Sequence, residues 1–302
     1  MAATFTRLRS RLEDSIGSDS FRWFDRSYLL DWSIAGTAWF AAWIIKELPP
    51  FESEFNLKDP AIDYKHHSNQ IGSGLNWTIA LILPLTVTVA VGCIRRSAIE
   101  VHHSCLALWA GRGYAYFFTE SLKNRVGRLR PDFLDRCKWD KTLKACAGNL
   151  DKVLDGRRSF PSGHSSTAFA GMTFLSFWIA GMTGAWCINQ PASSASLLSS
   201  KLARLSLSII PLLFATWVAI SRVEDNRHHI EDVIVGSLIG ITSAAICYLI
   251  YWPNPFTSQI AEGEPGAARA KSVYRDRNTD RSGNNYGYEL TGMDHERGTE
   301  LV

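Results

Sequence analysis

Residues 233–252 read VIVGSLIGITSAAICYLIYW, an apolar stretch without a single charged side chain. At 1.5 Å of rise per residue, a helix of this length covers roughly 30 Å, the thickness of the hydrocarbon core of a bilayer. Residues 75–94 form a second stretch of the same kind. Both predict membrane-spanning helices, although the mean hydropathy of the whole chain, -0.05, does not by itself suggest a membrane protein.

Four further stretches carry a weaker signal of the same kind. Residues 29–45, 167–188 and 205–220 are shorter or richer in Gly and Ser, but Trp and Tyr stand at several of their ends, as they do at membrane interfaces. Residues 101–122 contain His102, His103, Arg112 and Glu120, which must face the bundle interior, a cavity or an interface to be tolerated in lipid. A buried helix of a soluble protein is the alternative for this stretch.

We therefore expect an all-α fold, a bundle of six transmembrane helices within a membrane domain of residues 28–252. Residues 1–27 lack the apolar core of a signal peptide and are expected to be a cytosolic segment. Residues 253–302 are polar and poor in aliphatic residues, which predicts a disordered cytosolic tail.

The short basic loops indicate the orientation. Arg95 and Arg96 follow the second stretch, and Lys201 and Arg204 precede the fifth, so these two loops are predicted to be cytosolic. The basic segment 123–130 would then lie on the lumenal or extracellular face, against the charge rule, unless its cations have another role. Two cysteines share the same loop, Cys137 and Cys146, and their pairing is left open.

Three polar clusters flank the predicted spans, and an even number of crossings brings all three to one face of the membrane. The first cluster contains Lys123 and Arg130-Pro131. A Lys offers a point charge to a phosphate and an Arg offers a bidentate fork, while the proline restricts the residue before it. Taken alone, this cluster is more typical of a basic loop that contacts lipid headgroups than of a phosphate site.

The second cluster is Pro161-Ser162-Gly163-His164, directly before an apolar run. Ser162 is a candidate N-cap, Gly163 allows close approach of the backbone, and free N–H groups at a helix N-terminus favour an anion. His164 adds a proton donor. A plain helix cap is the alternative for this cluster.

The third cluster is Ser221-Arg222, followed by His228 and Asp232. If a helix begins at residue 227, His228 and Asp232 stand at i and i+4 on one face, so that the carboxylate could accept a hydrogen bond from one ring nitrogen and leave the other free to attack. His229 stands three residues before Asp232, and helix geometry alone does not separate the two histidines.

Together the clusters read Lys-x6-Arg-Pro, Pro-Ser-Gly-His and Ser-Arg-x5-His-x3-Asp, in that order. In these motifs, and in the spans between them, the sequence resembles the type 2 phosphatidic acid phosphatase superfamily, the lipid phosphate phosphatases, over about residues 28–252. Residues 55–62, FNLKDPAI, look like the fungal and plant phosphatidate and diacylglycerol pyrophosphate phosphatases. The resemblance implies a helical core shared with glucose-6-phosphatases and soluble vanadium haloperoxidases.

The resemblance also implies a role for each motif residue. His228 would be the nucleophile, which decides between the two histidines, Asp232 would orient it, and His164 would protonate the leaving group. The phosphate would be bound by Lys123, Arg130 and Arg222, with help from Ser162 and Gly163.

We therefore expect a multi-pass membrane enzyme that hydrolyses phosphatidate, diacylglycerol pyrophosphate and lysophosphatidate through a phosphohistidine, without a metal or other cofactor. A polyprenyl diphosphate or sphingoid-base phosphate phosphatase, or a lipid headgroup transferase, would carry the same motifs. A lipid phosphate in the bilayer is the expected partner and nucleic acid is not, while the preferred lipid, the membrane and the oligomeric state remain open.

Overall fold

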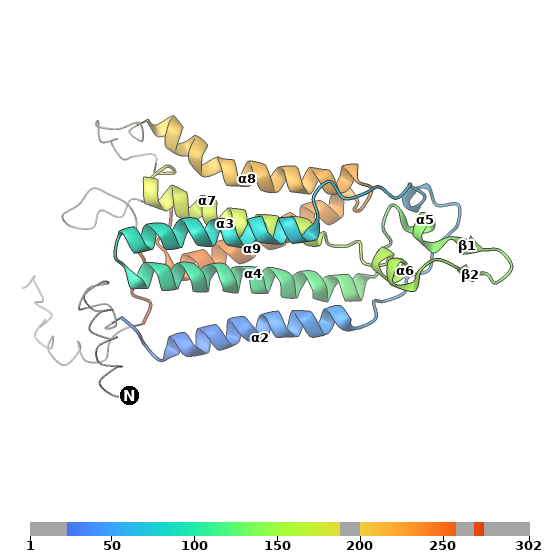
Figure 1. The fold of residues 1–302 in the computed structure, drawn as a ribbon, viewed down its shortest axis with the longest axis horizontal. Helices are drawn as coiled ribbons and strands as arrows, with labels where there is room; N and C mark the ends of the chain where they lie inside the picture. Colours follow the sequence, from blue (N-terminus) through green and yellow to red (C-terminus); the bar gives the residue numbers. More distant parts are fainter. Residues whose placement is uncertain (1–22, 188–199, 258–268, 275–302) are drawn as a thin grey trace, which may run out of the picture.

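The computed structural model describes residues 23–187, 200–257 and 269–274. Within them the chain forms six helices of more than 20 residues: α2 (Ser27–Glu47), α3 (Ser73–Ile94), α4 (Ala98–Val126), α7 (Gly163–Thr183), α8 (Lys201–Glu224) and α9 (Ile230–Tyr251). These helices form one elongated bundle, in which α7 packs against α9, α8 and α3, and α2 packs against α4 (Figure 1). The predicted helical bundle is thus present.

Four of the six helices, α2, α3, α8 and α9, are long and apolar enough to cross a membrane. The sequence also predicted spans in α4 and α7, but among the described helices these two do not reach that level of apolarity. Their position explains the difference. Both are central helices with many buried residues, including buried Ser, Thr and charged side chains. A helix surrounded by other helices does not need an apolar face toward lipid.

The polar residues of α4 that needed an interior position do have partners in the bundle. His103 is buried and its ring lies 3.1 Å from the Tyr28 hydroxyl, whereas His102 is half-buried and lies 3.0 Å from Trp32 Nε1. Both contacts join α4 to α2. Arg112, in the middle of α4, and Glu120, toward its C-terminal end, are also buried, and both line one cavity.

A small lobe connects α4 to α7 at one end of the bundle (Figure 1). It consists of α5 (Phe133–Cys137), β1 (Trp139–Asp140), β2 (Ala145–Cys146) and α6 (Leu150–Gly156). The two strands pair antiparallel, and Cys137 and Cys146 form a disulfide, which answers the question that the sequence left open. Ile62, from the short helix η1 (Pro60–Ile62) of the α2–α3 loop, packs into the same apolar cluster as Phe133.

Residues 269–274, part of the predicted tail, lie against the other end of the bundle. The backbone N–H of Lys271 donates to Tyr251 O at 2.9 Å, and the Tyr274 hydroxyl donates to Asp31 Oδ2 at 2.7 Å. Most of the predicted segment 1–27 and of the predicted tail 253–302 falls in residues 1–22, 258–268 and 275–302, which lie outside the described residues.

Candidate active site

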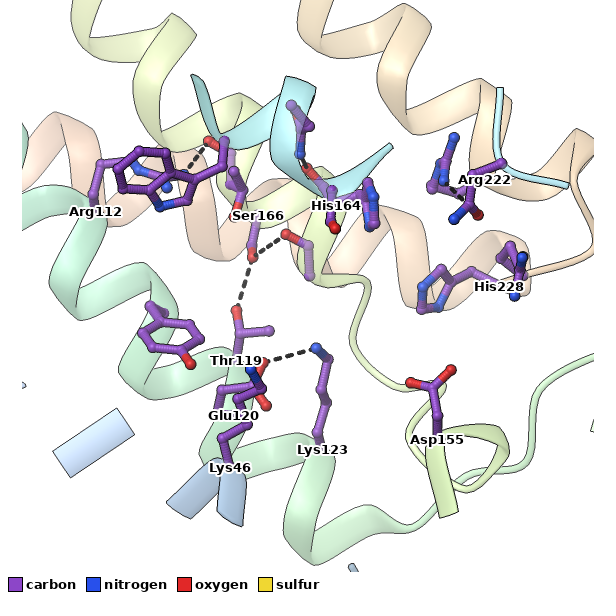
Figure 2. A pocket seen from close by; sticks show the side chains of 18 of the residues that line it. Lys46, Arg112, Thr119, Glu120, Lys123, Asp155, His164, Ser166, Arg222 and His228 are labelled. Carbon is purple, nitrogen blue, oxygen red and sulfur yellow. Dashed lines mark hydrogen bonds and ion pairs between the residues drawn. The ribbon is translucent and has the colours of Figure 1, made fainter. Parts of the chain in front are cut away.

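One cavity of about 540 Å³ lies where the lobe meets the bundle, and it brings the three polar clusters together (Figure 2). Six of the eight predicted site residues line it: Lys123, Arg130, Gly163, His164, Arg222 and His228. Ser162 and Asp232 are buried behind the wall and do not line the cavity. Residues that are about 100 positions apart in the chain therefore surround one space.

His228 is only 4% exposed, and its Nδ1 lies 2.7 Å from the carbonyl oxygen of Ser159. A carbonyl oxygen can only accept, so Nδ1 must carry the ring proton. Nε2 then keeps a free lone pair on a ring that lines the cavity. This is the nitrogen that could attack an electrophile in the cavity.

The sequence predicted that His228 and Asp232 lie one turn apart on a helix, and this prediction is wrong in detail. Helix α9 begins at Ile230, with His229 as its N-cap, so His228 precedes the helix. Its Nδ1 is 3.7 Å from Asp232 Oδ2, beyond hydrogen-bond distance, and bonds to Ser159 instead. The backbone turns out of helical geometry here because the side chain of Asp232, at N3, accepts from the N–H of the N-cap at 3.0 Å.

Asp232 is fully buried and has several donors around it. The Ser159 hydroxyl donates to Oδ2 at 2.5 Å, and Arg128 Nη1 donates to Oδ1 at 2.7 Å. Ser159 therefore connects the two predicted residues, because its hydroxyl binds Asp232 while its carbonyl binds His228. Sequence reasoning assigned no role to Ser159 or to Arg128.

The cavity distinguishes the two adjacent histidines. His228 lines it, whereas the lining does not include His229. The His229 ring lies 3.4 Å from Asp232 Oδ2 through Nδ1 and 3.2 Å from Ala61 O through Nε2, so it faces the α2–α3 loop. Tertiary structure thus favours the histidine that the family motif favours.

The N-terminus of α7 forms a second wall of the cavity. The Ser162 hydroxyl caps the helix by accepting from the N–H of Ser165 at 3.4 Å, so its role here is structural. A Cβ at Gly163 would lie 2.7 Å from Lys123 Nζ, so only a glycine leaves that cation in place. The Nε2 of His164 is buried without a partner among the described residues, and Asn76 Nδ2 donates to the His164 carbonyl at 3.0 Å.

Each predicted phosphate-binding cation has an acidic neighbour to which sequence reasoning assigned no role. Lys123 pairs with Glu120 at 2.8 Å, and Arg130 pairs with Asp155 at 2.9 Å. Arg222 pairs with Asp225 at 3.0 Å and also contacts Asn69 Oδ1 and Ser221 Oγ. Glu120 and Asp225 each stand three residues from their partners, at helical spacing, whereas Asp155 lies in α6, 25 residues from Arg130. They fix the direction of the cations before any ligand binds.

The charges around the cavity favour an anion. Six cationic side chains line it and only two carboxylates: Lys46, Arg112, Lys123, Arg130, Arg222 and Arg227 against Glu120 and Asp155. Burial lowers the pKa of His228 to about 4, opposed by Asp232 and assisted by the charge of Arg130. A histidine in this position is neutral at physiological pH and hence nucleophilic.

This fold and this cavity define a helical-bundle protein in which a buried histidine lines a cavity that is rich in cations. Residues 104–256, which contain all three motifs, match the PAP2 superfamily, and the chain belongs to that superfamily.

Curated relatives extend the comparison over most of the chain. It is 34% identical over 242 residues to Lipid phosphate phosphatase 2 of Arabidopsis thaliana, which covers 76% of this chain and 79% of that one. It is also 34% identical over 219 residues to Diacylglycerol pyrophosphate phosphatase 1 of Saccharomyces cerevisiae, with 68% and 72% covered. A third relative is the Probable diacylglycerol pyrophosphate phosphatase 1 of Schizosaccharomyces pombe, 33% identical over 220 residues, with 67% and 72% covered. No solved structure gives a significant match.

Proposed function

We propose that this chain is a membrane enzyme that hydrolyses lipid phosphates such as phosphatidate, diacylglycerol pyrophosphate and lysophosphatidate by way of a phosphohistidine. The observation that carries the proposal is the tautomer of His228: with Nδ1 donating to Ser159 O, the free Nε2 lone pair belongs to a cavity whose charged lining residues are mainly cations. The names of the plant and fungal relatives support a lipid phosphate as the substrate.

In the first step, the lone pair of His228 Nε2 forms a bond to phosphorus while the bond from phosphorus to the lipid oxygen breaks. That oxygen leaves with a proton from His164, whose buried Nε2 has no protein partner among the described residues. Asp232 stabilises the positive charge that the His228 ring acquires, directly at 3.7 Å and through Ser159.

In the second step, a water molecule attacks the phosphorus and the bond from phosphorus to Nε2 of His228 breaks. His164, now neutral, accepts a proton from that water, which returns both histidines to their starting state. Inorganic phosphate is released. The overall balance is one lipid phosphate and one water consumed, and one alcohol and one phosphate formed.

The transferred group carries negative charge on its equatorial oxygens, which needs fixed positive charge around it. Lys123, Arg130 and Arg222 supply this charge from three different segments, and Gly163 lets the N-terminus of α7 approach. The two carboxylates of the lining both pair with cations of the site. Such a donor set suits a phosphate and offers little to Mg²⁺, so we propose turnover without a divalent ion.

We further propose that α4 and α7 cross the membrane with the other four long helices, and that the cavity faces the lumen or the exterior. The basic residues Arg95, Arg96, Lys201 and Arg204 support this orientation. Protease treatment of sealed right-side-out vesicles should spare a C-terminal tag. Digestion of the tag from outside would contradict the orientation.

Phosphate release from a panel of lipids, measured in detergent micelles with excess chelator, tests the activity itself. Phosphatidate and diacylglycerol pyrophosphate should be hydrolysed, and vanadate should inhibit because its trigonal-bipyramidal form resembles the transition state. Activity that appears only when Mg²⁺ is restored would refute the cation-based site. Transfer of the phosphoryl group to an added alcohol, in place of phosphate release, would instead identify a headgroup transferase.

A further inference from the structure

Arg112 lies in the middle of α4 and is only 3% exposed, yet it lines the same cavity as the catalytic histidines (Figure 2). Its Nη1 donates to the carbonyl of Thr167 at 2.9 Å, and its guanidinium carbon is 6.0 Å from the centre of the Trp39 ring. Its Nε is buried and has no partner, and no carboxylate among the described residues forms an ion pair with it.

A buried arginine with one carbonyl partner and no counter-ion is costly, more so in a helix at membrane depth. Such a residue is seldom kept for packing alone. The guanidinium has five N–H donors, and the contacts in the structure use few of them. The remaining donors beside the cavity need an acceptor that arrives with a ligand.

The cavity is too long for a phosphate alone. Arg112, Tyr116 and Lys123 all line it from one side of α4, and Lys123 is eleven residues beyond Arg112, roughly 16 Å along the helix axis. On α7 the carbonyl that binds Arg112 belongs to Thr167, four residues beyond Gly163, or about 6 Å deeper. Its hydrogen bond to Thr167 thus places the guanidinium about one helical turn of α7 below Gly163, although the Arg112 backbone is farther from Lys123 along α4.

The walls of the deeper part come from different helices. Trp39 lines it from α2, and Trp77 lines it from α3. Both helices pack on α4, which forms the floor between them. The Trp77 side chain is also exposed on the outside of the bundle. A lipid in the cavity could therefore keep its glycerol region near Arg112 while its chains pass outward between α2 and α3.

We propose that Arg112 is a specificity-determining residue that binds an ester carbonyl of the lipid, and that the enzyme is thereby selective for acylated glycerol phosphates. This inference rests on the proposed function and names its substrate class. An ester carbonyl lies a few single bonds from the phosphate and is an acceptor without charge, so it satisfies a buried donor without a new ion pair.

The other substrate classes that share the motifs do not offer this acceptor. A polyprenyl chain is hydrocarbon beyond its diphosphate and would leave the guanidinium buried and unpaired. A sphingoid-base phosphate carries an ammonium group close to its phosphate, which Arg112 would repel. The ester preference thus separates glycerolipids from both alternatives.

The test compares diacyl phosphatidate with its dialkyl ether analogue of equal chain length, which lacks both carbonyls. The wild-type enzyme should turn over the diester about tenfold faster in kcat/KM, a typical effect of one hydrogen bond to a charged donor. In Arg112→Gln the diester should slow by about that factor and the ether analogue should change little. The ratio of the two substrates should therefore approach one.

Arg204→Gln is a matched control. Arg204 also donates to a backbone carbonyl, Thr183 O at 2.8 Å, and also has a buried Nε without a partner, but it does not line the cavity. It should leave the ratio unchanged. Arg112→Lys keeps the positive charge but has a single ammonium group in place of the forked guanidinium. It should give a diester-to-ether ratio between those of the wild type and Arg112→Gln.

Two results would overturn the proposal. One is equal turnover of diester and ether by the wild-type enzyme, which needs no variant to fold. The other is a loss in Arg112→Gln that is equal for both substrates, which indicates a structural role. Hydrolysis of para-nitrophenyl phosphate by the variant shows that its phosphate site is intact. Failure of the proposed function is distinct, since neither lipid would then release phosphate.

Discussion

Replacing Asp232 by Asn removes one buried charge and keeps the shape of the side chain. In the structure this carboxylate accepts from the Ser159 hydroxyl at 2.5 Å and from Arg128 at 2.7 Å, and it lies 3.7 Å from Nδ1 of His228. Once Nε2 of His228 is phosphorylated, the ring carries a positive charge because Nδ1 keeps its proton. The charge of Asp232 therefore acts mainly after the reaction has begun.

The size of this effect follows from the distance. Two unit charges 3.7 Å apart attract by about 4 kcal/mol at an effective dielectric constant of about 20. Arg128 already neutralises part of the carboxylate charge, so the net loss should be about 2 to 4 kcal/mol. We expect Asp232→Asn to slow phosphoenzyme formation by roughly 30- to 10³-fold, with a smaller change in KM.

The assay is rapid trapping of phosphoenzyme from radiolabelled phosphatidate, together with thermal unfolding in detergent to verify the fold. Glu231→Gln is the matched control, because Glu231 also binds Arg128, at 3.2 Å, but its side chain is 67% exposed. An exposed pair of this kind contributes little, so the control should stay within about twofold of wild type. A folded Asp232→Asn enzyme within about threefold of wild type would refute the electrostatic role.

Three further predictions concern the cavity itself. His228→Ala should abolish the phosphoenzyme, whereas His229→Ala should keep substantial activity because His229 does not line the cavity. Radiolabelled phosphoenzyme in His228→Ala, with none in His229→Ala, would instead identify His229 as the nucleophile. Because burial lowers the pKa of His228 to about 4, its neutral form persists in acid. For an aryl phosphate, whose leaving group needs little help from His164, kcat/KM corrected for substrate ionisation should therefore show no limb from His228 between pH 7 and pH 5; a midpoint near 6.5 would contradict the burial. Gly163→Ala should lower kcat/KM about tenfold or more, since its Cβ would lie 2.7 Å from Lys123 Nζ and displace that cation; unchanged kinetics would show that Lys123 relocates without cost.

Much of the fold was predictable because hydrophobic stretches long enough to span a bilayer are uncommon outside membrane proteins. The outer helices α2, α3, α8 and α9 satisfy that rule. The rule is weaker for α4 and α7, whose interior positions allow buried residues such as Arg112, His103 and Ser166. High hydropathy is needed only where a helix contacts lipid. Helices α4 and α7 mainly contact other helices, so their hydropathy is lower.

The site was predictable as a set of residue types but not as a geometry. Six of the eight motif residues line one cavity, while Ser162 and Asp232 support it from behind. His228 and Asp232 do lie close together, but not because they share one face of a helix as the spacing suggested. Helix α9 begins only at Ile230, so His228 precedes it.

By itself the sequence predicted which side chains would carry the chemistry and that they would meet on one face of a bundle, because motif order and the pattern of apolar stretches depend only on the chain. Tertiary structure alone decided which nitrogen of His228 is free, through the carbonyl of Ser159 that is 69 residues away. It also decided that Arg112 belongs to the cavity rather than to an inert interior. Hydrogen bonds between distant segments leave no periodic trace in a sequence, since their partners are set by packing and not by spacing.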